Sequence, residues 1–142
     1  MIAIEIVFPG LVGTDNRITS PTDTNYNCIA WATGRADGWW WPDSHGESFL
    51  PESAPRRESI DAFILAFASI GYHSCPNDSH ESGIEKVAIF ARDGTPTHAA
   101  RQLPNGRWSS KLGSGEDIEH ELDAVSGRLY GVVAIVLQRF GT

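Results

Sequence analysis

The chain contains only two cysteines, Cys28 and Cys75, in 142 residues. One possible disulfide is too few for the framework that holds small secreted domains together. The N-terminal segment, residues 1–9, has no basic region before its apolar run, and Glu5 interrupts that run. This segment is a poor match to a signal peptide, so we expect a cytoplasmic protein with reduced thiols.

Long apolar runs and basic residues are also scarce. No apolar run is long enough to cross a bilayer. The chain has 11 Lys and Arg residues and 18 Asp and Glu residues, which gives a net charge of −7. Nucleic-acid-binding proteins, in contrast, usually present a basic face. His73, Cys75 and His80 fit no closed zinc spacing. We therefore expect no membrane, nucleic acid, metal or cofactor partner.

The patterns that are present predict helices followed by an antiparallel sheet. Residues 59–71 form the clearest helix, with Ser59 as its cap, Gly71 at its end and an apolar repeat at Ile60, Phe63, Ile64, Phe67 and Ile70. Strands are expected at residues 86–91, 97–103, 107–112 and 129–137, with a hairpin turn at Asn105-Gly106. This order indicates one domain of the α+β class.

Cys28 lies where a polar loop gives way to a short apolar helix that ends at Gly34. Asn25 or Asn27 can cap that helix. A thiol in the first turn of a helix is close to unsatisfied backbone N–H groups and to the positive end of the helix dipole, which favour the thiolate. Cys28 is therefore a candidate nucleophile; the alternative is a buried structural cysteine in a core helix.

A thiol nucleophile needs a base, and His98 is the candidate because it begins a predicted strand beside the small residues Ala99 and Ala100. The alternative is a strand histidine with no catalytic role. The group that orients the imidazole is open between Ser110, on the following strand, and Asp117, whose charge suits the role. His120 follows Asp117, and Asp117 is otherwise a cap for a short helix through residues 122–125.

The tryptophan-rich loop, residues 38–46, is expected to line the substrate-binding cleft. Prolines and glycines exclude a long regular element there, and the candidate binding residues are Tyr26, Asn27, Trp39, Trp40 and Trp41. Asn25, Tyr26 or Asn27 would complete an oxyanion hole with the backbone N–H of Cys28. The alternative is a loop that covers the core with its indoles. Glu85, Lys86 and Arg101 are expected to form solvated or cross-strand ion pairs.

The order of Cys28 on a helix and His98 on a later strand resembles the papain-like cysteine hydrolases, including the NlpC/P60 and CHAP-type amidases. That resemblance implies a single papain-like domain over residues 1–142, with N-terminal helices packed on a small antiparallel sheet. It also implies Cys28 as nucleophile and His98 as base. The Cys-Gly-Ser-Cys-Trp and Asp-Cys-Ser-Gly signatures of those enzymes are absent.

A closer resemblance is to a family of small bacterial proteins that carry a domain of unknown function. It rests on Asn-Cys-Ile-Ala-Trp-Ala at residues 27–32, on the Trp-Trp-Trp-Pro run, and on residues 85–89, 98–113 and 117–120. That family brings no established activity.

Two classes of function follow from the sequence. The first is a cysteine hydrolase that acts on an amide or peptide bond through Cys28 and His98. The second is a non-catalytic binding protein that holds a protein partner on its tryptophan-rich surface. A small bacterial toxin or effector that uses the same hydrolase chemistry is a third possibility.

Overall fold

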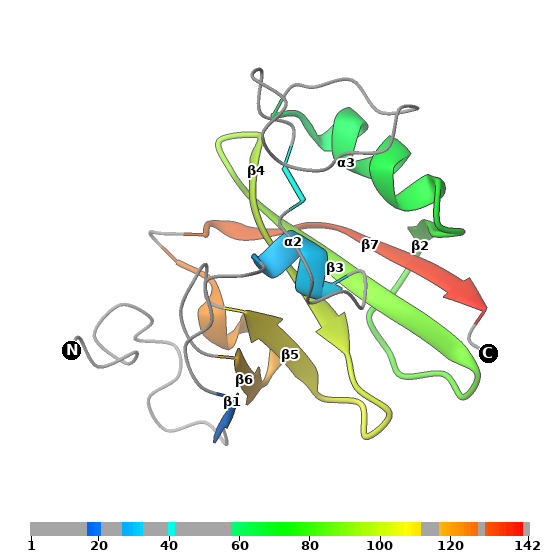
Figure 1. Cartoon of the computed structure of the whole chain (residues 1–142), viewed down its shortest axis with the longest axis vertical. Helices are drawn as coiled ribbons and strands as arrows, with labels where there is room; N and C mark the ends of the chain where they lie inside the picture. The colour runs from blue at the N-terminus through cyan, green and yellow to red at the C-terminus, as the bar shows by residue number, and fades with distance from the viewer. Residues whose placement is uncertain are drawn as a thin grey trace.

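The computed structural model describes residues 17–20, 27–32, 40–41, 58–111, 117–127 and 130–140. Seven strands form one antiparallel sheet in the order β1-β6-β5-β4-β3-β7-β2 (Figure 1). In chain order the elements are β1 (Arg17–Ser20), α2 (Cys28–Ala32), α3 (Ile60–Ala68), β2 (His73–Cys75), β3 (Ile84–Arg92), β4 (Thr95–Gln102), β5 (Trp108–Lys111), β6 (Asp117–His120), the 3-10 helix η2 (Leu122–Val125) and β7 (Val132–Phe140).

The fold is mainly β, so the expected α+β class with N-terminal papain-like helices is wrong. In the described part of the chain only α3 is longer than two turns, and α2 has five residues. Two strands account for much of the difference. Residues 17–20, which were not among the expected strands, form the edge strand β1, and Asp117 begins strand β6 where a helix cap was the alternative. None of the described helices is long and apolar enough to cross a membrane.

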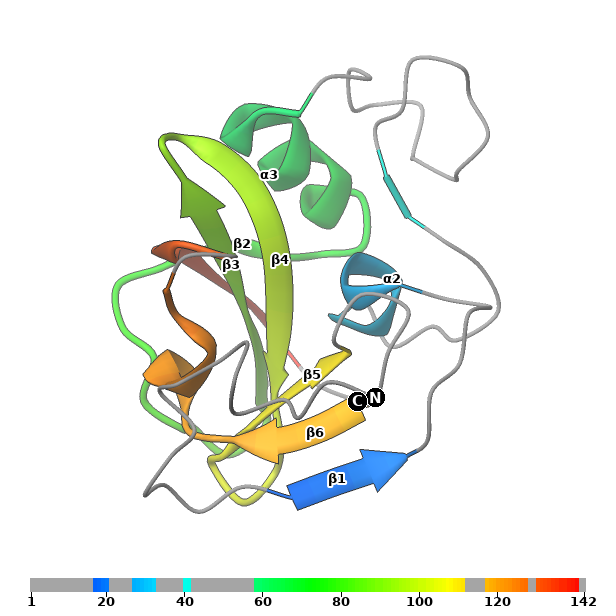
Figure 2. The same ribbon diagram turned by 90° about the vertical axis from the view of Figure 1, so that its left-hand side faces the viewer.

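Apolar side chains cover both faces of the sheet, because the middle strands alternate between two cores. On β3, Ile89 packs with α2 and α3, whereas its neighbour Phe90 faces the side that carries η2. On β4, Ala99 likewise packs on the side of α2 and α3, and Ala100 packs on the side of η2. Figure 2 shows α2 and α3 on one side of β4 and the orange segment around η2 on the other. We call these the helix face and the η2 face.

The local turn and capping signals are confirmed. Ser59 precedes α3, and its Oγ accepts the backbone N–H of Ala62 at 3.2 Å. The turn between β4 and β5 has Gly106 at φ 87°, where glycine has no steric penalty. The expected central strand at residues 129–137 is shifted and lies nearer the edge: β7 has only the three-residue β2 beyond it, and its terminal Phe140 is 82% exposed.

Candidate functional site

Asn27 fixes the start of α2 and therefore the position of Cys28. Its Oδ1 accepts the backbone N–H groups of Ala30 and Trp40, each at 3.1 Å. Its Nδ2 donates to the carbonyl oxygen of Trp40 at 2.8 Å. Asn27 is thus both the helix cap and a clamp on the backbone of Trp40. One of the two N–H donors of its amide is engaged by that carbonyl.

The Cys28 thiol is enclosed beside strand β4. Cys28 is only 5% exposed, and burial raises the pKa of its thiol to about 11. The backbones of Ala99, Ile29 and Cys28 itself act in the opposite direction. The thiol therefore rests protonated at neutral pH. Cys28 and Ala99 share one buried cluster, so the start of α2 packs against the strand that carries His98.

His98 is buried on the η2 face of β4. Its ring stacks on Tyr130, with centroids 4.0 Å apart, and meets the edge of Phe90 at 5.4 Å. Burial holds the pKa of His98 well below its usual range, and the charge of His120 acts in the same direction. Burial raises the pKa of Tyr130, and a charge on Cys28 raises it further.

A chain of hydrogen bonds extends from His98 through the next two strands. His98 Nε2 lies 2.9 Å from Ser110 Oγ, and Ser110 Oγ lies 2.7 Å from His120 Nε2. The chain ends where His120 Nδ1 lies 2.6 Å from the carbonyl oxygen of Glu121. Burial lowers the pKa of His120, so both imidazoles are neutral near pH 7.

The carbonyl at the end of this chain determines where each proton lies. A carbonyl oxygen only accepts, so His120 Nδ1 carries the proton and His120 Nε2 is an acceptor. The hydroxyl of Ser110 must then donate to His120 and accept from His98 Nε2–H. The network therefore assigns His98 to the Nε2–H tautomer, with a lone pair on Nδ1.

That lone pair is the distinctive feature of the site. His98 Nδ1 is buried and has no hydrogen-bond partner in the described part of the chain. Buried polar atoms are nearly always paired, so an unpaired one needs an explanation. A neutral imidazole with an unoccupied, buried nitrogen is able to accept a proton. His98 Nδ1 makes no hydrogen bond to the Cys28 thiol in the structure.

The pairing of β4 with β5 leaves space for the thiol. The two strands pair only at Arg101↔Ser109 and Gln102↔Trp108. Ala99 lies beyond this paired segment and belongs to the same buried cluster as Cys28. The separation of the two strands therefore admits the first turn of α2 to the edge of β4.

The two candidates for the orienting group lie on opposite faces of the sheet. Ser110 contacts His98, as described above. Asp117 is opposite Lys111 in the β5–β6 register, on the helix face, and its charge acts on Arg101. Among the described residues it makes no hydrogen bond to His98, and His120 is the second residue of the network instead. Alternation along residues 117–120 places His120 on the His98 side, but only once that segment is recognised as a strand.

The described tryptophans of the Trp-rich loop pack inward. Trp40 is 3% exposed and belongs to the helix-face core. The ring of Trp41 meets the edge of Phe63 at 5.5 Å. Two further candidate binding residues, Tyr26 and Trp39, lie outside the described residues.

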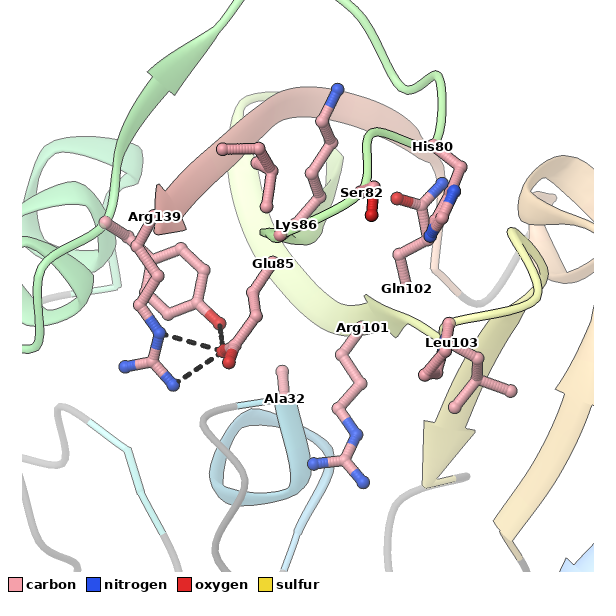
Figure 3. Close-up of a pocket in the computed structure, with 13 residues that line it drawn as sticks. Ala32, His80, Ser82, Glu85, Lys86, Arg101, Gln102, Leu103 and Arg139 are labelled. Atoms are coloured by element: carbon pink, nitrogen blue, oxygen red, sulfur yellow. Dashed lines mark hydrogen bonds and ion pairs between the residues drawn. The ribbon is translucent and has the colours of Figure 1, made fainter. Parts of the chain in front are cut away.

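A cleft of about 730 Å³ opens at the far end of α2 from Cys28 (Figure 3). Ala32, the last residue of α2, lines it, but neither Cys28 nor His98 does. Its charged or titratable lining residues are Tyr72, His80, Glu85, Lys86, Arg101 and Arg139.

Two features of the cysteines and histidines bear on metal and redox chemistry. Cys28 and Cys75 are both free thiols. Within the described ranges, no three His, Cys, Asp or Glu side chains are grouped so as to hold a metal ion.

One comparison with known proteins gives a match. A family model described as a domain of unknown function, DUF7689, covers residues 17–138. No curated protein and no solved structure matches the chain. The match covers most of the chain, from the start of β1 to residue 138 in β7, and confirms the expected membership in a family without an assigned activity. The chain therefore belongs to the DUF7689 family.

Proposed function

We propose that this protein is a cysteine hydrolase that cleaves an amide or peptide bond, with Cys28 as nucleophile and His98 as base. One observation carries the proposal. His98 Nδ1 is buried with no hydrogen-bond partner among the described residues, and the next residue, Ala99, belongs to the same buried cluster as Cys28. Cys28 belongs to the helix-face core and the His98 ring lies on the η2 face, so the reaction requires the thiol and Nδ1 to meet at the edge of β4.

The reaction follows from the proton positions. Cys28 Sγ attacks the carbonyl carbon while its proton passes to His98 Nδ1. The C–N bond then breaks, the leaving amine takes the proton from Nδ1, and a thioester remains on Cys28. Water next attacks the thioester and gives a proton to Nδ1. The carboxylic acid leaves, and the thiol regains its proton.

Ser110 and His120 act as positioning residues in this scheme. Ser110 Oγ accepts from His98 Nε2–H and so keeps the lone pair on Nδ1. His120, fixed by the carbonyl of Glu121, accepts from Ser110 in turn. This network contains no carboxylate, so it orients the base but stabilises an imidazolium only weakly. Proton transfer that accompanies attack fits such a site better than a permanent thiolate–imidazolium pair.

A binding protein that uses the tryptophan-rich loop has less support. That function needs exposed indoles, whereas Trp40 is buried and Trp41 packs on Phe63. A site used only for binding would also not explain the unpaired buried nitrogen of His98.

The direct test is acylation of the folded protein by p-nitrophenyl acetate, an activated ester, followed by mass spectrometry. The background carries Cys75→Ala, so that only one thiol remains. We expect one acetyl group on Cys28, and at least about a tenfold slower acylation in His98→Asn, in line with the usual size of general base catalysis. Equal acylation of His98→Asn, or none on Cys28, would overturn the proposal.

A further inference from the structure

Arg101 is a cation in the cleft that lacks an acceptor. The guanidinium carbon lies 4.2 Å from the centroid of the Trp31 ring, which is a cation–π contact. In the described part of the chain no hydrogen bond or ion pair engages its N–H groups. Of the three residues expected in solvated or cross-strand ion pairs, Glu85 and Lys86 form one each, whereas Arg101 forms none with a described residue.

The other cations of the cleft are already neutralised. Glu85 is bound by Arg139, at 2.9 Å through Nε and 2.8 Å through Nη2. Lys86 is paired with Glu81 at 2.7 Å. Figure 3 shows Arg101 extending past Ala32, apart from the Glu85–Arg139 pair. Its donors are therefore the ones that remain available to a ligand.

Arg101 is connected to the proposed nucleophile in two ways. Ala99, which shares a buried cluster with Cys28, and Arg101 are two residues apart on β4 and face the same side, so their Cα atoms are roughly 7 Å apart. Trp31, the platform under the guanidinium, is on the same short helix as Cys28. The Nε1 of Trp31 donates to Ser109 Oγ at 3.0 Å, which fixes the indole.

We propose that Arg101, on its Trp31 platform, is a binding subsite for a carboxylate, and that the protein acts on amides that carry a carboxylate close to the bond to be cleaved. This inference rests on the proposed function for its second half, whereas the carboxylate subsite stands on its own. The guanidinium presents parallel N–H donors that match a carboxylate in a two-point contact. The stacked ring holds it in place, so little side-chain freedom is lost on binding.

Burial makes an anion more favourable at this position. Loss of hydration lowers the pKa of Arg101, and the nearby charges of Tyr72, Glu85 and Asp117 act in the opposite direction. A carboxylate in contact with the guanidinium would replace the lost water with charge-assisted hydrogen bonds. A neutral amide of the same shape would not.

The test is a titration with glutarate against the neutral glutaramide, at constant ionic strength, followed by NMR. The signals to follow are the Arg101 Nε–H and the Trp31 indole N–H, with the buried Trp108 indole as an internal control. We expect glutarate, but not glutaramide, to shift the first two signals in a saturable way. Arg101→Gln should weaken glutarate binding at least about tenfold. Arg101→Lys keeps the charge but loses the pair of parallel N–H donors, so its affinity should lie between those of the parent and Arg101→Gln.

Arg92→Gln is the matched control, because it removes the same charge from an exposed position outside the cleft. Binding should change by less than about twofold in that variant, since its charge is screened by solvent. Equal losses in Arg92→Gln and Arg101→Gln, or equal binding of glutaramide, would overturn the subsite. Cys28→Ser should bind glutarate as the parent does. If Cys28 proves unreactive while glutarate still binds at Arg101, only the proposed hydrolase fails.

Discussion

His98 and Ser110 are joined across β4 and β5 by a 2.9 Å contact between Nε2 and Oγ, which leaves His98 Nδ1 as the unpaired nitrogen. The contact brings together a buried base and a hydroxyl that is itself bound to His120. In a neutral network this sequence of donors has one proton arrangement, and it exposes the lone pair on the nitrogen that has no other partner. The predictions depend on this contact or on the start of α2, which positions Cys28.

The first prediction concerns the tautomers. Nitrogen NMR of the imidazoles should find His98 protonated on Nε2 and His120 protonated on Nδ1. Ser110→Ala should cost about 1–3 kcal/mol of the free energy of unfolding, because two buried imidazole nitrogens lose their partner. It should also remove the preference of His98 for the Nε2–H form.

Ser109→Ala is the control for that variant. Ser109 is the adjacent residue on β5 and accepts from Trp31 on the helix face, so its loss should leave the His98 tautomer unchanged. A parent protein in which His98 carries its proton on Nδ1 would contradict the assignment.

The second prediction is a loss of stability in mild acid. Burial lowers the pKa values of His98 and His120 below 6.5 in the folded state, so the unfolded chain takes up protons first as the pH falls. The free energy of unfolding should therefore decrease below about pH 6.5, by up to about 1.4 kcal/mol per pH unit for each histidine. Urea unfolding at about pH 7.5 and pH 5.5 measures this difference.

Replacing one of the two buried histidines should reduce that pH dependence. His98→Asn should have a clearly shallower slope than the parent. Identical slopes in His98→Asn and the parent would show that His98 is not held neutral by the fold.

The third prediction concerns the clamp that places the nucleophile. Asn27→Ala removes a helix cap and a two-point contact with the backbone of Trp40, so we expect a loss of about 2–4 kcal/mol in the free energy of unfolding. Urea unfolding of the parent and of Asn27→Ala measures the difference. A loss below about 0.5 kcal/mol in Asn27→Ala would argue against the capping role.

Local patterns in the sequence were sufficient for the elements that depend on neighbouring residues. The cap at Ser59, the turn at Gly106 and the start of a helix at Cys28 all follow from side-chain and backbone chemistry within one turn. The fold class did not follow, because β6 depends on pairing with β5 and β1. Its residues 117–120 read as loop and cap until their partners are known.

The candidate site was predictable in part for the same reason. Cys28, His98 and Ser110 are recognisable from residue type and order. The face on which each side chain lies depends on strand register, which places Asp117 away from His98 and His120 toward it. The available donors of Arg101 could not be predicted, because Glu85 is bound by Arg139, which is far away in the sequence.

The most direct measurement is the alkylation rate of Cys28 by iodoacetamide across pH, in a Cys75→Ala background, for the parent and His98→Asn. Burial raises the pKa of the Cys28 thiol to about 11, so without a base it should react slowly at neutral pH. If His98 Nδ1 accepts the proton, the parent should react at least about tenfold faster than His98→Asn near neutral pH, and the two rates should converge at high pH. Equal rates throughout, or reaction of Cys28 only after unfolding in urea, would contradict the account.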